Sequence, residues 1–450
     1  MIKVGIIGVG RGISFVKAAP HCGMKLVALC DRWKTKMQPY RDNLDVATYT
    51  DYDAFLEHDM DAVILANNFH QHAPCAIKAL EAGLHVLSET AACGTLGEGV
   101  ALARAVEKSG KIYMFGENYQ YSAINQEMKC LYEEGFAGKF RYGEGEYVHP
   151  MDAWQSTWYI PYFDHWRAWI PATYYCTHSM GPIMFITGTR PVKVNGFVVP
   201  RDLEVQRESV SITRKDTASM IVCRMDNQAL VKLLQGGLAA HHGHVSIFGD
   251  KGMMEKANDG SGRLLLHKEA WHTSDGKKFV KDYVPVFRQY NELAAKTGHS
   301  GGDYFVEHYF AEAIRRNQPP FMDVYRGIDM SIIGIQAFRS ALQDGAAVDV
   351  PDFRDENVRL QYENDDWTPD PAKRKPGQPY SSVLGDIQPP EKAKIFAELV
   401  WQEQKKHWEG KPWKQYNPDF TVKQEFGPDC MRNLTSLKTL EYGMSKEDNR

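Results

Sequence analysis

The stretch that decides the fold is residues 1–32, MIKVGIIGVGRGISFVKAAPHCGMKLVALCDR. The apolar run at its start predicts a buried parallel strand, and the glycine turn Gly8-Val9-Gly10-Arg11-Gly12 follows at once. Residues 25–30 (KLVALC) predict a second buried strand. A strand that runs into a glycine turn, a helix and a second strand is typical of a dinucleotide-binding fold.

The acidic residue at the end of the second strand indicates which dinucleotide binds. Asp31 lies nineteen residues after Gly12 and is positioned to accept hydrogen bonds from a ribose 2'-hydroxyl. Because a carboxylate repels a 2'-phosphate, we expect NAD rather than NADP, although the neighbouring Arg32 is a residue type that accommodates such a phosphate. The third glycine is one place early, since Ile13 occupies its usual position. A tight turn without a ligand is the alternative interpretation.

The following residues continue the strand and helix alternation. Short apolar strands are expected at 61–66, 84–88 and 111–116, and helices at 71–82 and 96–109. Such alternation predicts right-handed crossovers and an α/β fold with a doubly wound parallel sheet. Ligands should then collect beyond the carboxyl ends of the strands, near Gly8, Asp31, Asn67, Glu89 and residues 117–118.

The pattern changes after about residue 121. A helix is expected at 125–134, strands at 140–149, 192–199, 210–213, 218–225, 229–236 and 244–248, and long helices at 304–315 and 327–342. We therefore expect a Rossmann domain over residues 1–120 and an α+β domain with an open-faced mixed sheet over 121–345. Residues 346–450 form an extension, with a helix at 392–406. Because this extension is rich in aromatic residues, it should pack on the two domains or on a neighbouring subunit of a homo-oligomer.

Composition excludes several classes of protein. The 450 residues carry a net charge of -4 at pH 7, which gives no electrostatic reason to expect nucleic acid or an anionic membrane as a partner. No apolar run approaches the length of a membrane span, and the chain opens on a core strand rather than on a signal peptide. Eight cysteines without a CxxC pair indicate buried thiols in a reducing compartment, most simply the cytoplasm.

Residues 163–181, FDHWRAWIPATYYCTHSMG, are dense in groups that stack on or hydrogen-bond to a polyol. Tyr175 and His178 are three residues apart at the start of an apolar helical run, so both can reach one cleft as an acid/base pair. A satisfied core histidine is an equally good interpretation. Residues 298–304 (GHSGGDY) predict a second ligand loop or a capped helix start. His241, His242 and His244 suggest a metal, but without further ligands nearby we expect none.

Together these residues resemble the Gfo/Idh/MocA oxidoreductases over residues 1 to about 350. The resemblance implies a Rossmann domain, an open-faced sheet domain that carries the substrate, and NAD or NADP between them. The motif residues that carry it are the Gly8-Val9-Gly10 turn, Asp31, the 67–80 segment with His72, Glu89, Asn118, the Trp166-Arg167 pair and His178. With the turn and its neighbours, the residues expected to bind the cofactor are Gly8, Gly10, Arg11, Gly12, Asp31, Arg32, Asn67, His72, Glu89, Asn118, Trp166 and Arg167.

Two departures point to one branch of this family. Dehydrogenases of the family usually have Glu-Lys-Pro at the fifth strand, where the lysine assists hydride transfer, but this chain has Glu89-Thr90-Ala91. Pro182 stands where an Asp or His is common. The sequence is similar to glycoside hydrolase family 109, which has a Tyr-x-x-His-x-x-Gly-Pro segment, here residues 175–182. The similarity of residues 144–149 to that branch also carries over Tyr147.

The branch implies a redox glycosidase, which oxidises C3 of a sugar with NAD, eliminates the C1 substituent, adds water and reduces C3 again. Accordingly His178 and Tyr175 are expected at the C3 hydroxyl, Tyr147 at the C2 proton, and Tyr304 and Asn118 around the sugar and nicotinamide. A plain NAD(P)-dependent sugar or inositol dehydrogenase is the main alternative, because it shares every cofactor residue. A non-catalytic NAD-binding sensor is a further one.

Overall fold

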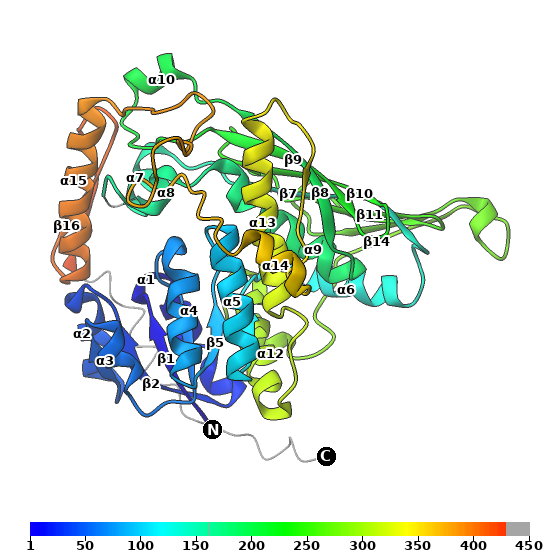
Figure 1. The fold of residues 1–450 in the computed structure, drawn as a ribbon, viewed down its shortest axis with the longest axis horizontal. Coiled ribbons are helices and arrows are strands. Elements are labelled where there is room, and N and C mark those ends of the chain that lie inside the picture. The colour runs from blue at the N-terminus through cyan, green and yellow to red at the C-terminus, as the bar shows by residue number, and fades with distance from the viewer. Residues whose placement is uncertain (161, 429–450) are drawn as a thin grey trace.

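The computed structural model describes residues 1–160 and 162–428. Two sheets dominate it (Figure 1). The first is a six-stranded parallel sheet in the order β3-β2-β1-β4-β5-β6, which confirms the doubly wound Rossmann arrangement predicted for the amino-terminal part. Its strands are β1 (Ile2–Ile7), β2 (Met24–Cys30), β3 (Ala47–Tyr49), β4 (Ala62–Leu65), β5 (His85–Ser88) and β6 (Tyr113–Phe115).

Helices join these strands. Each helix buries an apolar face, and side-chain caps start some of them. The chain forms α1 (Val9–Val16), α2 (Lys34–Asn43), α3 (Tyr52–Leu56), α4 (His72–Glu81) and α5 (Leu96–Ser109). The side chain of Thr95 accepts a hydrogen bond from the backbone N–H of Glu98 at 3.0 Å and thereby starts α5. The parallel strands are buried on both faces, and β4 is wholly buried, so helices cover the sheet on two sides.

The second sheet has nine strands in the order β14-β13-β12-β11-β7-β10-β9-β8-β15. It is mixed, because β7 and β10 are parallel while the other paired strands are antiparallel. This confirms the predicted α+β class of the second half. The strands are β7 (Phe140–Val148), β8 (Pro191–Val199), β9 (Ala218–Met225), β10 (Leu230–Gly236), β11 (Val245–Gly249), β12 (Met253–Lys256), β13 (Leu264–Lys268), β14 (Phe279–Tyr283) and β15 (Val348–Asp349).

Helices cover one face of this sheet, and one of them also joins it to the Rossmann part. The helix α9 (Thr177–Thr187) packs on β7, and α13 (Val324–Ala341) packs on β8 while it also contacts α5 and β6. The segment just before α13 also contacts β6, since the backbone N–H of Phe115 donates to the carbonyl oxygen of Met322 at 2.8 Å. The other helices of this half are α6 (Ala123–Glu133), α7 (Ala153–Tyr159), α8 (Trp166–Trp169), α10 (Leu203–Glu208), α11 (Asn291–Ala294) and α12 (Gly302–Arg316).

The predicted strand at 210–213 is wrong. These residues belong to no strand, because they pack on the carboxyl-terminal part of the chain instead of pairing with the sheet. Val210 lies in one apolar cluster with Phe396 and Val400, and Ile212 in another with Ala393 and Ala397. Side-chain hydrogen bonds replace a strand partner, since the Gln206 side chain donates to the carbonyl oxygen of Ser211 at 2.9 Å.

The structure describes the carboxyl-terminal extension as far as residue 428. It consists of α14 (Glu356–Tyr362), the predicted helix at 392–406, which is α15 (Glu391–Trp408), and a hairpin of β16 (Trp413–Tyr416) and β17 (Val422–Phe426). In Figure 1 α15 runs along one edge of the molecule, from the side of α10 to that of α2. Residues 429–450 of the predicted 346–450 extension lie outside the described residues. No helix in the described ranges is long and apolar enough to cross a membrane.

Candidate functional site

A cleft of about 1400 Å³ lies where the two sheets meet the extension. Its walls come from the carboxyl ends of the parallel strands, from the loops around β7, β9 and β10, and from α15. This volume exceeds that of most small-molecule pockets, so the cleft has room for a dinucleotide together with a sugar. Each predicted site residue either lines this cleft or lies outside it.

The three glycines of the turn have different environments. Gly8 has a φ of +90°, and a Cβ there would lie 2.4 Å from the carbonyl oxygen of Ala66. Gly10 faces open space, since only the Lys36 Nζ comes within 4 Å of such a Cβ, at 3.9 Å. Gly12 lies outside the cleft, and its Cβ would collide with Ile6 at 2.4 Å. Although it is one place early, Gly12 thus lets α1 pack on β1, which is the task of the third glycine in this motif.

Asp31 and Arg32 end β2 at the mouth of the cleft. The Asp31 carboxylate accepts hydrogen bonds from the backbone N–H groups of Val9 at 3.0 Å and Trp33 at 2.9 Å, which holds it beside the glycine turn. The Arg32 guanidinium donates to the Tyr162 hydroxyl at 2.5 Å and lies 4.9 Å from the centre of its ring. Arg32 is therefore directed toward the opposite wall and away from Asp31.

Arg11 connects the turn to two distant acidic residues. Its guanidinium lies 2.7 Å from a Glu89 oxygen and 2.8 Å from a carboxylate oxygen of the fully buried Asp303. Burial lowers the pKa of Arg11, but Glu89 and Asp303 more than offset this and raise it above its usual value. Asp303 also accepts from the Asn118 side chain at 3.0 Å and lies 3.0 Å from His299 Nδ1. The 298–304 block thus supports the floor of the cleft through Asp303.

His72 holds two loops at the rim. Its ring nitrogens lie 3.1 Å from the carbonyl oxygen of Ala91 and 3.2 Å from that of Asn67. Burial lowers the pKa of His72, which favours the neutral ring. Asn67 and Asn118 line the cleft, and the side-chain oxygen of each is buried without a hydrogen-bond partner within the described ranges. Because a buried acceptor without a donor is unfavourable, these two atoms mark a wall where a donor group of a dinucleotide would be accommodated.

The centre of the other wall is a histidine–carboxylate contact that the sequence did not reveal. His178 Nδ1 lies 2.7 Å from an Oε of Glu117, which is completely buried. The second Glu117 oxygen accepts from the backbone N–H of Tyr119 at 2.9 Å. Since Nδ1 is occupied, Nε2 is the ring nitrogen left to exchange a proton in the cleft. Residues 117–118 were expected near a ligand, but Glu117 was given no partner, because its pairing with His178 across 61 residues has no local signal.

Aromatic rings surround this pair. The His178 ring centroid lies 4.7 Å from those of Tyr147 and Tyr119, and 5.3 Å from that of Tyr175. Tyr175 stacks between Tyr147 and Trp166, with interplanar angles of 11° and 8°. Arg167 donates to the Tyr175 hydroxyl at 2.6 Å. The predicted residues Tyr147, Tyr175, His178, Trp166 and Arg167 therefore come together on one wall.

Tyr304 is, besides Gly12, the predicted site residue that the structure does not bring to the cleft. Only 1% of it is exposed, and its ring stacks on that of His308 at 5.7 Å with an angle of 18°. The physical reason is helical geometry, because successive residues of α12 point about 100° apart. Asp303 therefore faces Arg11 while Tyr304 points into the core.

The metal interpretation of the three histidines has no support from their contacts. His242 pairs with Glu146, and His244 Nδ1 lies 3.2 Å from the carbonyl oxygen of Lys256. No group of three or more His, Cys, Asp or Glu residues in the described ranges is arranged to hold a metal ion.

Tryptophans of α15 complete one end of the cleft. The Trp401 ring lies 5.1 Å from that of Trp33, and the Trp408 ring lies 6.3 Å from it. The Lys36 ammonium lies 4.8 Å from the Trp33 ring and 4.9 Å from the Trp408 ring. Trp33 follows Asp31 and Arg32, so the extension covers the end of the cleft where an adenosine would lie. The sequence predicted the helix, but not this contact.

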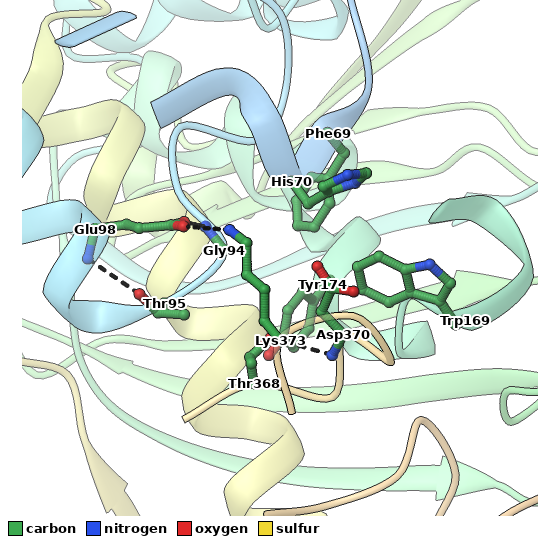
Figure 2. A pocket seen from close by; sticks show the side chains of 10 residues that line it. All are labelled: Phe69, His70, Gly94, Thr95, Glu98, Trp169, Tyr174, Thr368, Asp370 and Lys373. Carbon is green, nitrogen blue, oxygen red and sulfur yellow. Dashed lines mark hydrogen bonds and ion pairs between the residues drawn. The ribbon is translucent and has the colours of Figure 1, made fainter. Parts of the chain in front are cut away.

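A second cavity, shown in Figure 2, is of about 10 Å³ and fits one water molecule. Three buried polar atoms at it, His70 Nδ1, the Tyr174 hydroxyl and Asp370 Oδ2, have no protein partner among the residues described. Lys373 donates to Glu98 at 3.0 Å beside it. This cavity lies between the extension and the start of α5. Because it is far too small for a sugar, the large cleft remains the candidate site.

Two family models match separate parts of the chain. Residues 2–117 match the family model of the oxidoreductase family with an NAD-binding Rossmann fold (Gfo/Idh/MocA). Residues 216–359 match the model of the glycosyl hydrolase 109 C-terminal domain. The structure of a levoglucosan dehydrogenase in complex with NADH and L-sorbose has a TM-score of 0.66 and 19% identity, and covers 78% of this chain and 99% of its own.

Two curated relatives point the same way. The chain is 26% identical over 395 residues to a glycosyl hydrolase family 109 protein of Shewanella pealeana and, to the same extent, to an alpha-N-acetylgalactosaminidase of Shewanella oneidensis. Each alignment covers 78% of this chain and 85% of the relative. Residues 2–117 therefore form an NAD-binding Rossmann domain of the Gfo/Idh/MocA type, and residues 216–359 are similar to the carboxyl-terminal domain of glycosyl hydrolase family 109.

Proposed function

We propose that this protein is an NAD-dependent glycoside hydrolase that cleaves its substrate through transient oxidation of the sugar at C3. The observation that carries the proposal is the contact of His178 with the buried Glu117. The His178 ring lies beside those of Tyr147 and Tyr175, in the same cleft as the glycine turn. The names of the two relatives and of the sugar dehydrogenase support a carbohydrate substrate.

The turn, Asp31, Asn67 and Asn118 would hold the dinucleotide. NAD held there would supply the acceptor for the C3 hydride and the donor that restores it. Asp31 would accept the ribose hydroxyls, and its carboxylate would repel a 2'-phosphate, which favours NAD over NADP. The tryptophans of α15 would keep the cofactor bound between turnovers.

His178 acts as the base at the C3 hydroxyl. Its Nε2 takes the hydroxyl proton as the C3 hydride departs, and Glu117 stabilises the imidazolium that forms. At the end of the cycle the same nitrogen returns the proton to the C3 oxygen. Because Glu117 is buried and also bound to the backbone of Tyr119, it fixes the ring and its tautomer.

Tyr147 acts at C2. Once C3 is a ketone, the C2 proton becomes acidic. The phenolate form of Tyr147 takes this proton, the C1–O bond breaks, and a water molecule protonates the leaving alkoxide. The hydroxide that remains adds to C1, and the Tyr147 phenol returns its proton to C2, which restores the phenolate. Burial and the neighbouring Tyr119 and Tyr175 raise the pKa of Tyr147, whereas the charge of Arg167 lowers it. Arg167 would therefore stabilise the phenolate that accepts the C2 proton.

An aryl glycoside in D2O tests this proposal. We expect release of the phenol, deuterium at C2 of the sugar product, and no net NADH. Steady accumulation of NADH from a free sugar would instead establish a dehydrogenase. Bound NAD with neither reaction, over a panel of aryl glycosides, would contradict an enzymatic role for the cleft.

A further inference from the structure

A lysine at the sugar side of the cleft has no part in the mechanism above. Lys215 lines the cleft, is only partly exposed, and precedes β9. In the sheet register, Ala218 of β9 pairs with Gly236 of β10, and Gly236 pairs with Val148 of β7. The end of β9 next to Lys215 is thus at the same edge of the sheet as Tyr147, opposite the glycine turn.

The acidic residues that line the cleft are all bound to other groups. They are Asp31, Glu89, Asp152 and Asp216. Asp31 binds backbone N–H groups, Glu89 binds Arg11, and Asp152 caps α7 by accepting from Gln155 at 2.8 Å. The carboxylate next to Lys215, that of Asp216, accepts from the Ser382 hydroxyl at 2.6 Å and the Val383 N–H at 3.1 Å, and is only 1% exposed.

Several cations of the cleft lack a counter-charge. Within residues 1–160 and 162–428, neither Lys215 nor Arg167 forms an ion pair, and the same is true of Arg32, Lys36, Arg201 and Lys405. Lys215 and Arg167 belong to neighbouring segments, since the backbone N–H of Arg214 donates to the carbonyl oxygen of Ala168 at 2.7 Å. The Arg214 side chain itself lies 3.6 Å from Asp164. Burial and the charges of Arg167 and Arg201 lower the pKa of Lys215 to about 7. Arg201 itself donates to the carbonyl oxygen of Lys215 at 3.0 Å. Like charges in a partly desolvated site repel one another, so an anion that binds between them is stabilised. Such an anion raises the pKa of the lysine and thereby keeps it protonated.

We propose that Arg167 and Lys215 form an anion subsite, and that the substrate is a glycoside that carries an acidic group on its sugar, a carboxylate or a sulfate ester. The inference rests on the proposed function and narrows its substrate class. The planar guanidinium suits the two oxygens of such a group, and the lysine adds a second positive charge. The diphosphate of the cofactor does not account for these cations, because its expected position is the glycine turn and Lys215 belongs to the opposite sheet.

Binding to the NAD-loaded protein tests the subsite without any turnover. Glucuronate and glucose, galacturonate and galactose, and glucose 6-sulfate are titrated by calorimetry. We expect an acidic sugar to bind at least about 10-fold more tightly than its neutral partner. Tighter binding of the uronates or of the sulfate tells which group is preferred. Equal affinities within every pair, including the sulfate, would overturn the proposal.

Variants of the lysine assign the effect to this side chain. Lys215→Met should reduce the preference for the acidic sugar about 10-fold, and Lys215→Arg should restore most of it. Lys193→Met is the matched control, because Lys193 is exposed on β8 and pairs with Asp349 at 2.7 Å. If Lys215→Met does not fold, as judged by thermal unfolding, Lys215→Arg and the pH dependence of the native protein decide the matter.

The pH dependence follows from the lysine proton. With its pKa near 7 in the free protein, Lys215 is charged below that pH and neutral above it, so affinity for the acidic sugar should fall between pH 6 and 9. In Lys215→Arg the affinity should stay constant over this range, because arginine keeps its charge. Arg167, Arg201 and Asp216 are the other charged groups around the lysine, and a fall that persists in Lys215→Arg would contradict the assignment.

The two proposals fail separately. Selective binding of the acidic sugar without release of phenol from any aryl uronide would leave the subsite and reject the glycosidase. Release of phenol from neutral aryl glycosides alone would leave the glycosidase and reject the subsite.

Discussion

The two walls of the cleft are built in different ways. The cofactor wall comes from one local pattern, since the turn and Asp31 lie within the first 31 residues. The substrate wall is assembled from residues that are far apart in the chain, such as Glu117, Tyr147 and His178, with Lys215 at its edge. A change in the first wall should therefore alter cofactor binding, and a change in the second should alter chemistry while the cofactor stays bound.

The largest separation of the two walls is expected for His178→Asn. Loss of the general base should lower kcat about 10³-fold, while the affinity for NAD stays within about 2-fold of that of the native protein. Steady-state kinetics with an aryl glycoside and a fluorescence titration with NADH measure the two quantities. His267→Asn is the control, because His267 forms a comparable pair with Glu269 at 2.9 Å outside the cleft. A parallel loss of NADH binding would show that the walls are not independent.

Glu117→Gln tests whether the buried carboxylate acts through the histidine. The amide keeps the shape and can still accept from the Tyr119 N–H, but it does not stabilise a charged imidazole, so kcat should fall about 10²-fold with little change in KM. Stopped-flow measurement of the first hydride transfer should show the same loss. An unchanged rate would mean that Glu117 only holds the fold.

On the cofactor wall, Asp31→Ser removes a charged acceptor. We expect the Kd of NADH to rise about 10-fold and the discrimination against NADPH to fall by a similar factor. Titration of both dinucleotides measures the change. A discrimination that survives the substitution would show that Asp31 does not determine the choice of cofactor.

The sequence predicted local features well and features set by tertiary packing poorly. The parallel sheet and its turn were predicted because each signal is local, and even the early Gly12 does the work of the third glycine. The strands β12, β13 and β14 were missed because they are short and half-exposed at one side of the sheet, without a clear apolar alternation. Residues 210–213 have strand-like composition, yet tertiary packing against α15 decides their conformation.

The candidate site shows this limit in its residues. Tyr175 and His178 could be predicted together because three residues separate them, whereas nothing near His178 in the sequence points to Glu117. The 298–304 block was correctly noticed, but the direction of each side chain on α12 depends on the helix phase, so Asp303 rather than Tyr304 supports the cleft. The contact of Trp33 with α15 joins residues more than 360 positions apart and is set by the tertiary fold alone.

That contact gives the smallest expected effect. Trp401→Ala removes a ring pair worth about 1 kcal/mol, so NADH should dissociate about 5-fold faster with little change in the rate of chemistry. Stopped-flow displacement of bound NADH measures the rate. Trp271→Ala is the control, because that tryptophan is 77% exposed and distant from α15 in sequence. An unchanged dissociation rate would remove α15 from the account of cofactor retention.

The most direct test of the central claim uses an aryl glycoside deuterated at C3. Transient oxidation predicts a primary isotope effect on a single turnover, and it predicts that the deuterium is found again at C3 of the released sugar, because the same hydride returns. Phenol release without an isotope effect would contradict this account, and so would deuterium left on an accumulating reduced cofactor.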